Sequence, residues 1–160
     1  MGFNVPSEAR NPYSLNEADL EDWLSKAVDT FPELAEQFER AEIHPMAFWI
    51  ELRLALDRAY QCAPINEDLI GRIYGYASWC FDQPETSSAD TDLGTAVVVC
   101  FIEHLPETHA IAADLYRWMS VETFEGCESV FRYHLSEEQY QTFRNDFIRK
   151  KRSWSGPSFL

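Results

Sequence analysis

The stretch AVVVCFIEHL, residues 96–105, decides the fold because it is the most uniformly apolar part of the chain. Seven apolar residues in a row end at Glu103 and His104, and Pro106 follows closely. Three consecutive valines would also suit a buried strand. The apolar pattern spans residues 93–105, however, which is long for a strand and ordinary for a helix. Aspartates just upstream offer an N-cap and the proline offers a stop, so we predict a central helix with neighbours on all sides.

Apolar residues recur at helical spacing on both sides of this segment. Ser136 and Gln139 form a capping-box pattern, and Asn66 offers a cap to the helix that follows it. Only 6 glycines and 8 prolines occur in 160 residues, which disfavours a sandwich of short strands. The expected helices cover about residues 17–28, a segment after Thr30, 45–61, 67–81, 93–105 and 107–119, with two more beginning at Ser120 and Ser136.

These patterns predict an all-α fold with one domain over residues 1–160. The helices, about eight in number, would form a bundle or a short solenoid-like stack around the central helix 93–105. Outside the helices we expect a flexible N-terminal arm at residues 1–14, a loop at 83–92 and a C-terminal tail at 153–160.

The net charge of −14 is distributed unevenly. Residues 1–92 hold 18 acids against 6 bases, whereas residues 93–160 hold 9 acids against 7 bases. Such a field repels nucleic acid and anionic membranes and attracts a basic protein. We therefore expect neither nucleic acid nor membrane as a partner. The alternative explanation of the charge is solubility alone.

The cysteines show no C-x-x-C spacing, and the first residues lack the pattern of a secretory signal. The longest apolar run is far shorter than the ~18 residues of a membrane span. We expect a soluble, cytoplasmic protein whose thiols are free and buried: Cys62, Cys80, Cys100 and Cys127.

Acidic side chains on the first two predicted helices are the candidate partner-binding residues, because they would steer a basic protein toward that face. In the tail, Trp154 follows the last helix and is the tryptophan most expected to be exposed. It would anchor a partner or cover the fold. The acidic candidates are Glu17, Asp19, Glu21, Asp22, Glu33, Glu36 and Glu39.

A second candidate site surrounds Gly75, since a glycine inside a helix costs ~1 kcal/mol relative to alanine. Close packing against residues 97–100 would explain the presence of glycine at position 75. The alternative is a ligand pocket walled by Tyr74, Tyr76 and Trp79.

Cys100 and His104 are four residues apart, so they share one face of the predicted helix, with Glu103 beside them. Cys80 would approach from another helix. A zinc site needs three or four converging ligands. The alternative places Cys100 in the core and lets Glu103 and His104 emerge at the helix end. We assign no metal to the chain.

The sequence contains no phosphate-binding glycine loop, H-E-x-x-H, G-x-S-x-G or kinase signature. We therefore assign no catalytic residue and no cofactor, and the prediction leans away from an enzyme.

Three stretches, RIYGYASWCF (72–81), AVVVCFIEHLP (96–106) and WMSVETF (118–124), resemble a bacterial all-helical family of unknown function over about residues 65–147. The resemblance implies helices and a bacterial source, but no activity. The size and acidity of the chain also resemble those of immunity proteins that neutralise bacterial toxins, often basic nucleases.

Three hypotheses of function follow. The first is a non-catalytic protein-binding domain with an acidic face for a basic partner, in the manner of an immunity protein. The second is a small-molecule or metal site near Tyr76, Trp79, Cys100 and His104. The third is a structural subunit whose tail, residues 153–160, completes a homodimer.

Overall fold

The computed structural model describes residues 17–38 and 44–160, and for residues 17–21 it describes the backbone only. In this part of the chain every regular element is a helix, which confirms the predicted all-α class. The predicted arm at residues 1–14 lies outside the described residues.

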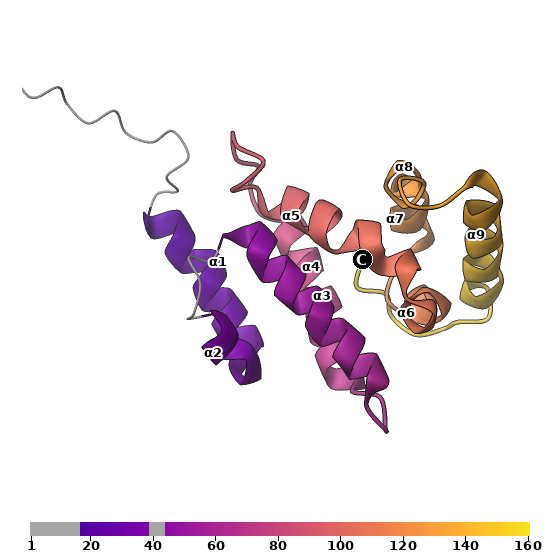
Figure 1. The fold of residues 1–160 in the computed structure, drawn as a ribbon, viewed down its shortest axis with the longest axis horizontal. Coiled ribbons are helices and arrows are strands. Elements are labelled where there is room, and N and C mark those ends of the chain that lie inside the picture. Colours follow the sequence, from indigo (N-terminus) through magenta and orange to yellow (C-terminus); the bar gives the residue numbers. More distant parts are fainter. Residues whose placement is uncertain (1–16, 39–43) are drawn as a thin grey trace, which may run out of the picture.

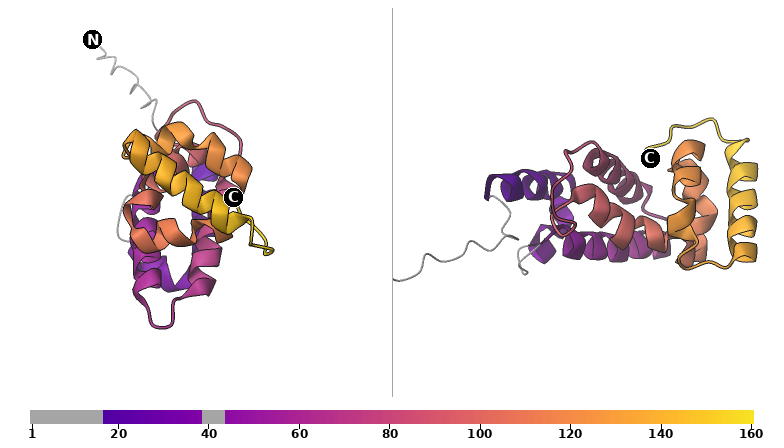
Figure 2. Two further views of the ribbon diagram at one scale, coloured as in Figure 1. Left: turned by 90° about the vertical axis from the view of Figure 1, so that its right-hand side faces the viewer. Right: turned by 90° about the horizontal axis from the view of Figure 1, so that it is seen from above.

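The helices follow one another along the long axis of the molecule, from α1 and α2 at one end to α9 at the other (Figure 1). Seen from above, α3, α4 and α5 form the middle of this stack (Figure 2). The described elements are α1 (Glu17–Thr30), η1 (Pro32–Leu34), α2 (Ala35–Phe38), α3 (Pro45–Gln61), α4 (Glu67–Phe81), α5 (Leu93–Cys100), η2 (Ile102–Glu107), α6 (His109–Asp114), η3 (Leu115–Arg117), α7 (Val121–Gly126), α8 (Glu128–Phe131) and α9 (Glu137–Lys151), where η marks a 3-10 helix.

Side-chain caps fix several helix starts at the predicted residues. Asn66 accepts a hydrogen bond from the Leu69 amide at the start of α4. At the start of α9, the Ser136 and Gln139 side chains each bond to the other residue's backbone amide, which completes the predicted capping box. These caps satisfy amides that have no partner within the helix.

One contiguous cluster of buried apolar residues runs from Trp23 on α1 to Phe147 on α9. Its centre is a chain of aromatic contacts that joins α3 and α4 to Phe101, just after α5, and to Trp118, just after η3. Phe101 lies 5.0 Å from Trp49 on α3 and 5.5 Å from Tyr74 on α4, measured between ring centroids. Tyr74 in turn stacks on Trp118 with an interplanar angle of 1°. The stretch around Phe101 is therefore buried between α3 and α4, as its composition predicts.

The predicted single helix over residues 93–105 is wrong in its second half. Here α5 ends at Cys100, and Phe101 leaves helical geometry with φ −127° and ψ −66°. The chain then continues as the 3-10 helix η2, which contains Pro106. In an α-helix the ring of Pro106 would clash with the carbonyl of Ile102, four residues earlier, and proline has no amide to donate. The tighter 3-10 winding avoids that arrangement.

Gly75 does not pack against residues 97–100, as the sequence suggested. A Cβ atom built at Gly75 would meet only Phe159 of the C-terminal tail, at 3.8 Å, an ordinary van der Waals distance. Gly156 differs, because a Cβ there would lie 2.2 Å from the Trp154 ring.

Residues 83–92 form the predicted loop between α4 and α5. The carboxylate of Asp92 closes the loop, since it accepts hydrogen bonds from the amides of Thr86 and Thr95.

In the described part of the chain, no single helix combines the length and apolar composition of a membrane span. Residues Leu93–Glu107 and His109–Arg117 meet that test only as a pair, and the pair bends by 96°.

The buried aromatic centre predicts a large loss of stability on truncation of Trp49. Trp49 is fully buried, whereas its neighbour Ile50 is 44% exposed. We expect Trp49→Ala to lower the free energy of unfolding by about 3–5 kcal/mol and Ile50→Ala by less than about 1 kcal/mol. Urea denaturation measures both. Equal losses would show that Trp49 does not lie in the core.

The space around the two glycines predicts opposite effects of alanine. Gly75→Ala should raise the free energy of unfolding by about 0.5–1 kcal/mol, because the helix gains propensity and nothing is displaced. Gly156→Ala should lower it, because the Trp154 ring must move. Paired thermal melts test this, and destabilisation by Gly75→Ala would restore the close-packing hypothesis.

Candidate functional site

Those predicted acidic residues that the structure describes lie on α1, η1 and α2, at one end of the stack (Figure 1). Asp22 and Glu36 are exposed. The side chains of Glu17, Asp19 and Glu21, and the whole of Glu39, lie outside the described residues.

Glu33 forms an ion pair within the chain. Arg72 on α4 binds its two carboxylate oxygens through Nη1 and Nη2, at 3.1 and 2.5 Å. Arg72 also donates to Asp68 and to the Thr30 carbonyl. The hydrogen bond from Arg72 lowers the pKa of Glu33. Contrary to its predicted role, Glu33 therefore connects η1 to α4 rather than facing a partner.

Ion pairs are unevenly distributed over the described part of the chain, although Glu122 on α7 and Glu138 on α9 are also exposed acids without a described ion pair. Seven basic side chains, all from α3 to α9, pair with acids: Arg53, Arg72, Arg117, Arg132, Arg144, Arg149 and Lys150. On α1, α2, the end of α4 and the following loop, six exposed acids form no ion pair with a described residue. We call them the acidic group: Asp22, Asp29, Glu36, Asp82, Glu85 and Asp90.

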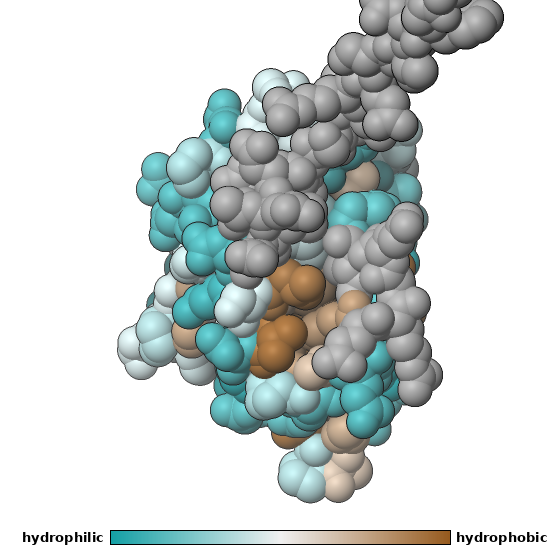
Figure 3. Space-filling view, turned by 90° about the vertical axis from the view of Figure 1, so that its left-hand side faces the viewer, coloured by the Kyte–Doolittle hydropathy of each residue, from teal (hydrophilic) through white to brown (hydrophobic). Residues whose placement is uncertain are grey.

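Two members of the acidic group share a groove. Asp22 from α1 and Glu85 from the loop line a cavity of about 400 Å³, whose apolar lining includes Trp23 and Trp79. Viewed onto this end of the molecule, hydrophilic residues cover most of the described surface, and a small group of hydrophobic residues lies near its centre (Figure 3).

Of the aromatic residues proposed as one pocket, Tyr76 and Trp79 line a cavity of about 660 Å³ beside Gly75, whereas Tyr74 does not line it. Tyr74 is fully buried, and burial raises the pKa of its hydroxyl well above the usual value. Tyr76 is also buried, and its hydroxyl donates to the Trp23 carbonyl at 3.0 Å. Trp79 stacks on Tyr76 at 5.4 Å and reaches the groove beside Asp22. The structure thus does not bring Tyr74 into a pocket with Glu103 and His104.

Trp154 is not the exposed anchor that the sequence suggested. It is partly buried, with its ring edge-on to Tyr116 at 5.8 Å and the Arg117 guanidinium 5.5 Å from its centroid. The tail continues to Trp118, whose carbonyl accepts hydrogen bonds from the amides of Phe159 and Leu160. Trp154 therefore covers its own chain.

Three of the four thiols are unsuited to nucleophilic chemistry. Burial raises the pKa of Cys80 to about 12, and it also raises the pKa values of Cys100 and Cys127. The expectation of four buried thiols is wrong for Cys62, which is exposed just after α3, and for Cys127, which is half-buried.

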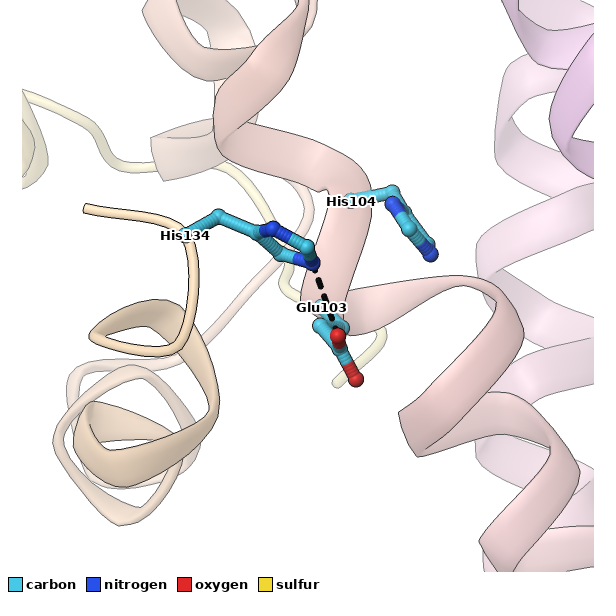
Figure 4. Close-up of side chains that lie close together, drawn as sticks. All are labelled: Glu103, His104 and His134. Atoms are coloured by element: carbon cyan, nitrogen blue, oxygen red, sulfur yellow. Dashed lines mark hydrogen bonds and ion pairs between the residues drawn. The ribbon is translucent and has the colours of Figure 1, made fainter.

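A cluster of carboxylates and imidazoles forms where η2 meets the turn after α8 (Figure 4). Glu103 and His104 come from η2, and His134 comes from the turn. Glu103 Oε1 lies 2.7 Å from His134 Nε2, and the two imidazole centroids are 5.1 Å apart. Glu107 adds a second carboxylate, with Oε2 at 3.1 Å from His104 Nδ1. Four polar groups thus converge at a partly exposed position.

The sequence did not identify this cluster as a whole. It drew attention to Glu103 and His104 but paired them with Cys100 and Cys80. The break at Phe101 removes the regular helical face that Cys100 and His104 were expected to share. His134 lies thirty residues beyond His104 in an isolated turn, and no local spacing connects the two.

The fold thus defines an all-α protein with two surface features of interest, the acidic group and the Glu–His cluster. Comparison with models of protein families, with curated proteins and with solved structures found no match to this chain.

The Glu33–Arg72 pair predicts a pH-dependent contribution to stability. A lowered pKa in the folded state stabilises the fold above the ordinary carboxyl pKa, and this contribution is lost as pH falls through the lowered value. We expect Glu33→Gln to cost less than about 1 kcal/mol at pH 7, because the pair is largely exposed.

The difference between wild type and Glu33→Gln should shrink as pH falls below the ordinary glutamate pKa of 4.5. Glu85→Gln, which removes an exposed carboxylate without a described ion pair, serves as the control and should show no such trend. Urea denaturation at a series of pH values measures both. A pH-independent difference for Glu33→Gln would contradict the assignment.

Proposed function

We propose that this protein is a non-catalytic binding domain that recognises a basic protein through its acidic group. The observation that supports the proposal is the division of charge described above. Most described basic side chains from α3 onward are already paired, whereas the six acids of the acidic group keep their charge without a described counterion.

Uncompensated acids on one side produce a directional field, which raises the rate of encounter with a basic surface. The interaction of exposed charges is screened beyond a Debye length of about 8 Å at physiological salt, so binding should weaken as salt increases.

The groove between Asp22 and Glu85 adds a specific contact. A lysine or arginine side chain of the partner would lay its apolar stem against Trp79 and place its charge between the two carboxylates. Lysine and arginine side chains commonly lay their apolar stems along apolar surface while the charged head stays in polar surroundings.

The proposal includes the mode of action of an immunity protein, in which an acidic surface covers a basic toxin. It also includes the bacterial cytoplasm as the place of action, a compartment that suits the free cysteines.

Charge reversal on the acidic group tests the proposal. A basic protein captured from cells that make this chain would be identified, purified and titrated against Asp22→Lys/Glu85→Lys. We expect its affinity to fall by at least about tenfold, because two attractive contacts become repulsive. Wild-type binding should also weaken when the salt concentration is raised.

The matched control, Glu122→Lys/Glu138→Lys, changes the net charge equally but alters α7 and α9. It should retain most of the wild-type affinity. Equal losses of affinity in the two double variants would show that only the net charge matters, which would contradict the proposal. Binding that does not depend on salt would contradict it as well.

A further inference from the structure

Glu103 is a carboxylate that the fold leaves without a strong cation. It is partly buried, with 18% of its side chain exposed, and no described lysine or arginine pairs with it. Arg53 pairs with Glu107 instead, at 3.8 Å. The one described partner of the Glu103 carboxylate is the imidazole of His134. A close positive charge stabilises the ionised form of a partly buried carboxylate, because burial has removed some of its hydration.

His104 also has an unused polar atom. Its Nδ1 nitrogen is buried and makes no hydrogen bond with a described residue, although Glu107 Oε2 lies 3.1 Å away. Buried nitrogens are normally satisfied, so one without a partner needs an explanation. A lone pair beside two carboxylates suits the binding of a cation.

The donor atoms converge from two separate elements. One ligand atom each from Glu103, His104 and His134 lie within 4.8 Å of one another. Bonds from zinc to imidazole nitrogen and carboxylate oxygen measure about 2.0–2.2 Å, which places tetrahedral ligands about 3.3–3.5 Å apart. Small side-chain rotations would bring the three atoms to these separations, because all three side chains are partly exposed.

We propose that Glu103, His104 and His134 bind one divalent transition-metal ion with the ligand preference of Zn²⁺. Two imidazoles and one carboxylate form a common zinc ligand set that leaves the fourth position to water. Glu107 Oε2 lies 3.1 Å from the same Nδ1 nitrogen of His104, so a cation bound there would also offset the charge of this second carboxylate.

The ion would join two parts of the stack. η2 leads out of the central helix α5, and His134 lies in the turn that leads into α9. A bond from the ion to each part would tie that turn to the centre of the fold. This inference is independent of the acidic group, which lies on α1, α2 and the loop 83–92, so either proposal can fail without the other.

Zn²⁺ titration of the purified full chain tests the site, with a chromophoric chelator as competitor. We expect one Zn²⁺ per chain, bound with a dissociation constant in the micromolar range or tighter. Loss of an outer-shell partner typically weakens metal binding by about 10–100-fold, so His134→Ala should weaken it by at least about 100-fold. His109→Ala, which removes an exposed histidine outside the cluster, is the control and should bind as the wild type does.

Two further measurements exclude other causes. Glu103→Gln keeps a hydrogen-bonding side chain but removes the charge, and it should also weaken Zn²⁺ binding while the metal-free melting temperature stays close to that of the wild type. The Co²⁺-loaded protein should show weak visible bands without a thiolate-to-cobalt charge-transfer band, because no cysteine is a ligand.

No Zn²⁺ binding by the wild type, equal binding by wild type and His134→Ala, or a thiolate band would each overturn the proposal.

Discussion

The insertion of Phe101 between Trp49 and Tyr74 is the contact on which the rest of the structure depends. Its ring is fully buried, and the backbone leaves α-helical geometry at this residue. The same contact joins α3, α4 and the central segment, while Tyr74 extends the aromatic chain to Trp118. Because an interior packed this tightly tolerates few alternative arrangements, the position of Phe101 sets the direction in which η2 leaves the core.

That direction has a consequence for the surface. The 3-10 helix η2 begins directly after Phe101 and carries Glu103, His104 and Glu107 toward the turn after α8. Had α5 continued as a regular helix, successive residues would have turned by 100° rather than about 120°, and these side chains would point elsewhere. The Glu–His cluster is therefore a product of the break in the central helix.

Some polar side chains of the described chain are buried or ion-paired within the fold, whereas others stay accessible and without an ion pair. Tyr74, Tyr76 and Cys80 lie in the interior, where burial disfavours their ionised forms, and burial also raises the pKa values of Cys100 and Cys127. Most of the described arginines form ion pairs between elements, as Arg72 does with Glu33 and Arg117 with Glu67. The acidic group and the Glu–His cluster lack such a described lysine or arginine partner at Asp22, Glu85 and Glu103, and the two proposals rest on them.

The sequence alone determined the helical class, the helix starts at Asn66 and Ser136, the loop at 83–92 and the excess of acid in the first half. All of these depend on near neighbours in the chain, such as caps, apolar spacing and composition, so local patterns encode them. Only the tertiary structure decided that Arg72 forms an ion pair with Glu33 and that His134 contacts Glu103. It also decided that Phe159 rather than residues 97–100 lies next to Gly75. Each of these contacts joins residues far apart in the sequence, and their meeting depends on how the whole chain packs around Phe101.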